Sequence, residues 1–180
     1  MVDERGLVRL MKEAWKTKTG YIMANLNGGL YIQTDAWEVL IPGVMVPRKV
    51  LALMVEHVGS FLRDGEAVCC SKNGGAQEVA LQFLQNSAAK MEKAENLKRA
   101  ERTRLAWDGY DLWQSEENLQ ILGVAPEYEA LVSVEAPGAP FFFGASVMWK
   151  DEAYICVRGV QLPPVVGIQL SAYQWIGGKG

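Results

Sequence analysis

The stretch "TGYIMANLNGGLYIQTDAWEVLIPG", residues 19 to 43, decides the N-terminal part of the fold. Two runs of β-prone residues flank the Asn-Gly-Gly sequence at 27–29, whose residues tolerate the positive φ values that a tight hairpin demands. A third β-prone run, "AWEVLI", ends at Pro42. The stretch therefore predicts a small antiparallel meander.

Amphipathic segments lie on both sides of this meander. Residues 4 to 16, "ERGLVRLMKEAWK", place apolar side chains three and four positions apart, which predicts a helix with one buried stripe. Residues 44 to 59, "VMVPRKVLALMVEHVG", predict a second helix, with Pro47 suited to its first turn and Gly59 to the left-handed position after its end. The run "GEAVCCSK", residues 65 to 72, resembles a strand.

The rest of the chain changes character twice. Residues 76 to 107 contain no Gly or Pro and are rich in helix-forming residues, so we expect one long central helix whose second half could pair with another copy of the chain. Residues 108 to 180 are β-prone and aromatic, which predicts a C-terminal antiparallel β-sheet with a last strand at 165–176.

The expected fold class is therefore α+β: an N-terminal helix, a small antiparallel meander, a second helix, the long helix and the C-terminal sheet. We expect three units, 1–75, 76–107 and 108–180, in one compact domain or two small lobes.

The bulk composition is that of a globular protein. Of 180 residues, 49% are hydrophobic and 22% are charged, so disorder of the whole chain is excluded. The N-terminus lacks the pattern of a signal peptide, and no run has the roughly 18 apolar residues of a membrane span. The three cysteines form no disulfide framework. We expect a cytoplasmic protein without membrane contact.

No complete catalytic, metal or nucleotide motif occurs, so we expect neither a metal nor a cofactor, and no residue is assigned to catalysis. His57 could act as a general base or a metal ligand, or it could be a packed histidine with one hydrogen bond at the edge of a core helix. A nucleophile pair of His57 with Cys69, Cys70 or Cys156 remains an alternative, because such partners meet in space.

Arg48 and Lys49 are a candidate partner-binding pair. Both lie in the first turn of the second predicted helix, where cations oppose the helix dipole, so another interaction should favour them. They could receive an anion, such as a nucleic-acid phosphate or an acidic patch of a partner. The alternative is that they pair with Asp35 or Glu38 or point into water.

The last part of the chain is acidic. Residues 108 to 180 carry nine acids and three cations, which leaves this part free to meet a basic partner. The acidic candidates for partner binding are Glu116, Glu117, Glu127 and Glu129. Six cations and three acids between Lys90 and Arg104 form a predicted helix face that could contact nucleic acid or stay solvated.

The order "LMKEAWKTKTGY", "DAWEV", "PRKVLALMVEHVG" and "DGEA" resembles small proteins of Firmicutes phages and other mobile elements, over roughly residues 7 to 67. Some proteins of this kind are anti-CRISPR inhibitors of type II systems. The resemblance implies a viral protein in the cytoplasm of a bacterial host that binds an RNA-guided effector nuclease, or its complex with guide RNA, and blocks DNA binding or cleavage without catalysis. It also implies that the acidic residues could compete for the channel that holds nucleic acid.

Two other functions fit the residues. One is a phage or plasmid accessory protein that binds nucleic acid through Arg48, Lys49 and the face from Lys90 to Arg104. The other is a small enzyme whose site is assembled around His57 and a cysteine.

Overall fold

The N-terminal half is an antiparallel sheet built on the predicted hairpin. A computed structural model describes residues 2–115 and 120–162. Asn27 and Gly28 have φ values of 52° and 76°, as a tight turn between twisted strands requires. The predicted meander and the strand after it are confirmed. The strands are β1 (Tyr21–Leu26), β2 (Gly29–Gln33), β3 (Trp37–Ile41), β4 (Ala67–Ser71) and β5 (Gly75–Glu78).

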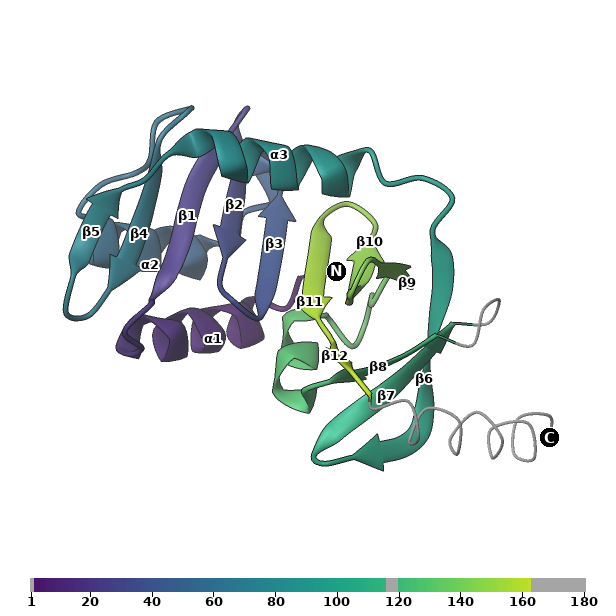
Figure 1. Ribbon diagram of the computed structural model, residues 1–180. Helices are drawn as coiled ribbons and strands as arrows, with labels where there is room; N and C mark the ends of the chain where they lie inside the picture. Colours follow the sequence, from purple (N-terminus) through teal and green to yellow (C-terminus); the bar gives the residue numbers. More distant parts are fainter. Residues whose placement is uncertain (1, 116–119, 163–180) are drawn as a thin grey trace.

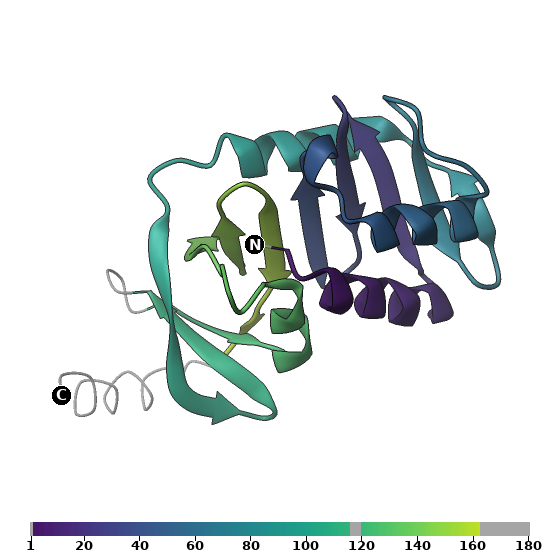
Figure 2. The same cartoon turned by 180° about the vertical axis from the view of Figure 1, so that it is seen from behind.

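Helices cover both faces of this half-sheet. Helices α1 and α2 lie on one face and α3 lies on the other (Figures 1 and 2). The two first predicted helices are confirmed: Asp3 caps α1 by accepting the Gly6 N–H at 2.6 Å, and Gly59 ends α2 with φ 89°. The helices are α1 (Glu4–Lys16), α2 (Arg48–Val58) and α3 (Leu81–Glu92), with 3₁₀ turns η1 (Gly43–Met45) and η2 (Pro126–Leu131).

The predicted long central helix is wrong. Helix α3 ends at Glu92, Asn96 adopts a left-handed φ of 53°, and Lys98–Trp107 forms the strand β6. Residues with good helix propensity become a strand because β6 gains hydrogen-bonded neighbours on both sides, β7 and β9. The proposed pairing of two copies through a long helix therefore has no basis. No helix in the described ranges is long and apolar enough to cross a membrane.

The C-terminal half is an antiparallel sheet, as predicted, and the turn at 151–153 joins its hairpin of β10 and β11. Gly144, with φ 60°, lies in the turn that separates β9 from β10. The strand predicted at 165–176 lies outside the described residues. The strands are β6 (Lys98–Trp107), β7 (Tyr110–Ser115), β8 (Ile121–Val124), β9 (Ala139–Phe143), β10 (Ser146–Lys150), β11 (Tyr154–Arg158) and β12 (Val160–Gln161).

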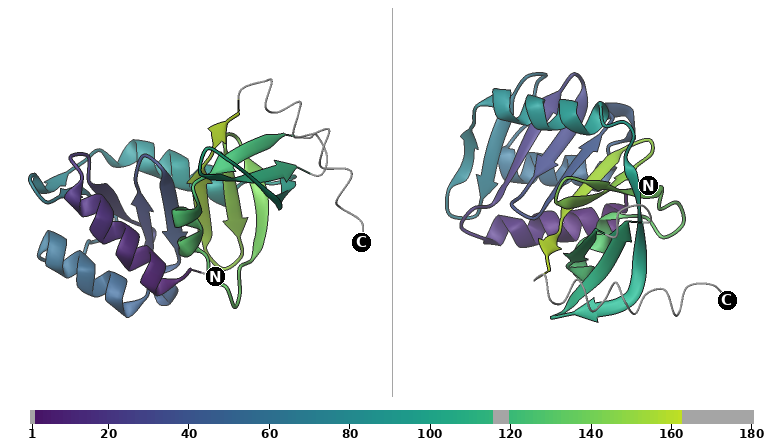
Figure 3. Two further views of the ribbon diagram at one scale, coloured as in Figure 1. Left: turned by 90° about the horizontal axis from the view of Figure 1, so that it is seen from below. Right: turned by 45° about the vertical axis from the view of Figure 1, so that its right-hand side comes forward.

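The two half-sheets are continuous. The strand order is β12-β8-β7-β6-β9-β10-β11-β3-β2-β1-β4-β5, and the junction is the antiparallel pairing of β11 with β3. One residue after β11, Gly159 leads into β12, which pairs with β8. The C-terminal strands therefore return on themselves in a closed ring (Figure 3). A Cβ on Gly159 would lie 2.8 Å from the Leu122 Cβ, so this crossing requires a glycine.

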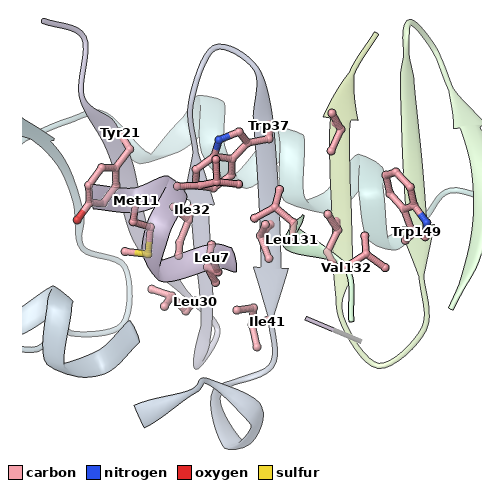
Figure 4. Close-up of a cluster of buried hydrophobic side chains, with 14 of the residues drawn as sticks. Leu7, Met11, Tyr21, Leu30, Ile32, Trp37, Ile41, Leu131, Val132 and Trp149 are labelled. Atoms are coloured by element: carbon pink, nitrogen blue, oxygen red, sulfur yellow. The ribbon is translucent and has the colours of Figure 1, made fainter. Parts of the chain in front are cut away.

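One apolar core joins the two halves. Leu7 and Met11 of α1 pack on Ile32 and its neighbours in the sheet, and the same cluster continues to Leu131 and Trp149 (Figure 4). A second cluster lies under α3 on the opposite face. Because both faces are covered, β3 and β11 each bury three successive residues, 39–41 and 155–157.

The contact between α1 and η2 is very close, and we call it the η2 seam. The Asp3 N–H donates to the Leu131 carbonyl at 2.8 Å. A Cβ on Gly6 would lie only 1.6 Å from the Ala130 carbonyl oxygen, so helix and 3₁₀ turn touch through their backbones. The seam anchors the N-terminus of α1 on the C-terminal half.

Candidate protein-binding site

A cavity of about 210 Å³ opens between α2, η1 and the turn that joins β1 to β2. Its lining is mostly apolar side chains and glycine backbone. The lining residues are Asn25, Gly28, Gly29, Leu30, Gly43, Val46, Leu51, Met54, Phe61 and Leu62.

Glycine backbones shape one wall of the cavity. A Cβ on Gly43 would lie 2.0 Å from the Gly28 carbonyl oxygen, so η1 and the β1–β2 turn approach more closely than any side chain permits. Val44 and Met45 follow Gly43 on η1, and Gly43 and Val46 on either side of them line the cavity.

Three hydrogen bonds hold the segment 59–66 on β1. The Asn25 N–H donates to the Glu66 carbonyl, the Gly65 N–H donates to the Asn25 carbonyl, and Asn25 Nδ2 donates to the Leu62 carbonyl, each at 2.9 Å. The segment is thus a fixed wall, and it presents Phe61 to solvent while Leu62 is buried.

Exposed apolar side chains lie on the segments that line this cavity. Phe61 itself lines it and is 62% exposed; Val44, 98% exposed, and Met45 lie on η1, and Val55 lies on α2. The other exposed large apolar residues of the described ranges, Phe83, Val134 and Val160, lie outside these segments. We call Val44, Met45, Val55 and Phe61, together with the cavity, the α2 patch.

Arg48 and Lys49 begin α2, at the border of this patch. Lys49 does not pair with Asp35 or Glu38; its partner is Glu4 of α1. The Glu4 carboxylate accepts the Lys49 backbone N–H at 3.0 Å and lies 3.6 Å from Lys49 Nζ. This carboxylate is the interaction that offsets a cation in the first helical turn. Arg48 is exposed to solvent.

The acidic candidates lie elsewhere. Glu127 and Glu129 belong to η2, and neither lines the cavity. Glu129 Oε2 lies 3.1 Å from Arg102 Nη1, and Arg102 also pairs with Asp111. Burial raises the pKa of Glu129, Arg102 opposes this shift, and Asp111 adds to it. Glu116 and Glu117 lie outside the described residues.

The basic stretch from Lys90 to Arg104 does not form a helix face. Its residues are divided among the end of α3, a connecting segment and β6. Arg102 is held in ion pairs with the two carboxylates of Asp111 and Glu129. The predicted nucleic-acid surface on one helix is therefore wrong.

His57 is a packed edge histidine. Its ring stacks on Trp15 with a centroid distance of 4.0 Å, and the Tyr21 hydroxyl lies 2.6 Å from His57 Nδ1. Burial lowers the pKa of His57, and nearby Glu56 partly opposes this shift. The Tyr21 hydroxyl is therefore hydrogen-bonded to a neutral imidazole at neutral pH.

The cysteines do not meet His57 in a hydrogen bond. All three are free: Cys70 is buried, its neighbour Cys69 is half-buried, and Cys156 is buried in the cluster under α3. Burial raises the pKa of Cys70 to about 12, which keeps this thiol protonated at neutral pH. Within the described ranges, no group of His, Cys, Asp and Glu is arranged to hold a metal ion.

Comparison with known proteins gives no relative: no family model, curated protein or solved structure matches this chain. The sequence reasoning placed Arg48 correctly at the start of a helix but missed the cavity and Phe61 beside it. The position of Phe61, two residues after the glycine that ends α2, was a local signal. An apolar residue at this position either packs back on the helix or remains exposed.

Proposed function

We propose that this chain is a binding protein that docks another protein on the α2 patch and performs no reaction itself. The observation that supports this proposal is a cavity lined by the exposed Phe61, with three more exposed apolar side chains on the elements η1 and α2 that border it. When a partner covers exposed apolar area of this kind, binding is stabilised by roughly 25 cal/mol per Å².

The partner class comes from the resemblance of residues 7 to 67 to anti-CRISPR inhibitors. We propose an RNA-guided effector nuclease of a type II system as the first partner to test. The α2 patch lies within those residues, so the similar segment and the apolar surface coincide. Inhibition by coverage of a protein surface needs no active site.

The test adds purified protein to effector, guide RNA and target DNA and measures cleavage against the protein-to-effector ratio. We expect cleavage to stop near an equimolar ratio. Phe61→Asp should abolish inhibition, because it places a charge at the mouth of the cavity. Phe83→Asp is the matched control, since Phe83 is 65% exposed on α3, at the opposite face of the sheet.

The outcomes separate the two parts of the proposal. If no type II effector in a broad panel is inhibited, this partner class is wrong. If inhibition occurs and both aspartate variants inhibit as well as the wild type, docking on the α2 patch is wrong. A gel shift with nucleic acid that weakens on Arg48→Ala plus Lys49→Ala would favour an accessory protein that binds nucleic acid instead.

A further inference from the structure

The α2 patch combines a small cavity with a nearby cation, and the two together narrow the kind of partner segment that fits. This step rests on the proposed function and concerns the same surface.

The cavity suits one side chain. Its volume of about 210 Å³ is below the roughly 300–1,000 Å³ of sites that hold drug-sized ligands. Aliphatic side chains and glycine backbone dominate its lining, so the transfer of an apolar side chain from water into the cavity is favourable. Protein interfaces commonly bury one such anchor residue in a fitted pocket at their centre.

Arg48 lies on the same side of α2 as the apolar patch. At 100° per residue, Arg48, Leu51 and Val55 fall within a sector of about 60° on the helix. Leu51 lines the cavity, and Val55, one turn further along α2, is exposed. A partner segment that places an apolar residue in the cavity therefore passes close to the guanidinium.

Two other cations at this surface have carboxylate partners. Lys49 Nζ lies 3.6 Å from the Glu4 carboxylate, and Arg63 pairs with Glu66. In the described part of this surface, Arg48 has no such ion pair. It also begins α2, where the helix dipole adds positive potential.

We infer that the α2 patch binds a polypeptide segment that inserts one bulky apolar side chain into the cavity and pairs a carboxylate with Arg48. The partner segment is negatively charged where the site is positively charged. Its apolar side chain and its carboxylate should lie about one helical turn apart, because Arg48 precedes Leu51 of the cavity by three residues on α2. The carboxylate contributes mainly specificity, because an exposed ion pair is worth at most about 1 kcal/mol.

The experiment selects short random peptides displayed on phage against the immobilised full chain. We expect the selected peptides to share a bulky apolar residue with Asp or Glu within one helical turn. A fluorescein-labelled synthetic copy of a selected peptide is then titrated in a polarisation assay. Binding should be lost with Phe61→Asp and kept with Phe83→Asp.

A charge swap tests the role of Arg48. Arg48→Glu should weaken the acidic peptide about fivefold at low salt, and a peptide with Lys in place of its acid should regain affinity on this variant. Arg104→Glu, at an exposed position on β6, is the control with the same change in net charge. The difference between the two variants should shrink at high salt.

Two results would overturn this inference while leaving the proposed function standing. The first is that the selected peptides need Phe61 but show no acidic preference and no response to Arg48→Glu. The second is that no peptide needs Phe61 although inhibition of an effector does, which would mean that a folded surface docks. If neither peptide binding nor inhibition depends on Phe61, the proposed function itself fails.

Discussion

The α2 patch and the η2 seam both carry charged residues that the sequence marks as candidates for partner binding, and the structure uses them in opposite ways. At the seam, Glu129 pairs with Arg102, and helix and turn touch through their backbones. At the patch, Arg48 and Phe61 remain exposed beside a cavity. The difference teaches that residue type does not separate binding charges from structural ones, because the neighbours that neutralise them come from distant parts of the chain.

The comparison has a direct consequence for mutations. Changes at the seam should alter the free energy of unfolding, whereas changes at the exposed part of the patch should alter binding with little effect on stability.

The largest effect is expected for Gly6→Ala at the seam. Alanine normally stabilises a helix by roughly 0.5–1 kcal/mol relative to glycine. Here its Cβ would lie 1.6 Å from the Ala130 carbonyl oxygen, so α1 must move away from η2. We expect the free energy of unfolding in urea to fall by about 3 kcal/mol. An equal or higher stability than the wild type would show that the seam is not closely packed.

Asn25→Ala tests the support of the patch. It removes the hydrogen bond to the Leu62 carbonyl and should lower the free energy of unfolding by about 1–2 kcal/mol. Gln77→Ala is the matched control, because its side-chain amide also donates to a carbonyl, that of Gly74, but from an exposed strand. Similar losses in the two variants would mean that the wall formed by residues 59–66 does not depend on Asn25.

Glu4→Ala and Arg48→Ala compare, at the border of the patch, a charge that has a partner with a charge that is exposed. Glu4 caps the start of α2 and pairs with Lys49, so its loss should cost about 1 kcal/mol of unfolding free energy. Arg48→Ala should change stability by less than about 0.5 kcal/mol. Thermal and urea unfolding measure both, and a larger loss for Arg48→Ala would place Arg48 among the structural charges.

The smallest effect concerns the pH dependence of the seam. Burial raises the pKa of Glu129, so its contribution to stability is fully present below the ordinary value of 4.5 and is lost as pH rises through the raised value. Glu129→Gln should therefore be slightly more stable than the wild type at neutral pH. The gap should close when unfolding is measured below about pH 4.5. A gap that does not change with pH would contradict the raised pKa.

Local features of the sequence were sufficient for the first part of the fold. The Asn27-Gly28 turn, the Asp3 cap of α1 and Gly59 after α2 act over a few residues, and each carries its own conformational preference. The same reasoning gave, as one of two interpretations of His57, a packed histidine with one hydrogen bond at the edge of a helix. It could not supply Tyr21 or Trp15 as its neighbours, because these come from other elements.

The sequence by itself determined an α+β protein with two N-terminal amphipathic helices, a hairpin and an antiparallel C-terminal sheet, because these depend on hydrophobic period and turn residues. Only the tertiary structure decided that Lys98–Trp107 is a strand, that β11 joins the two half-sheets, and that Glu4 holds Lys49. It also decided where apolar surface stays uncovered around Phe61. The physical reason is that strand pairing and ion pairing between distant residues outweigh intrinsic propensities, which differ by less than about 1 kcal/mol per ordinary residue.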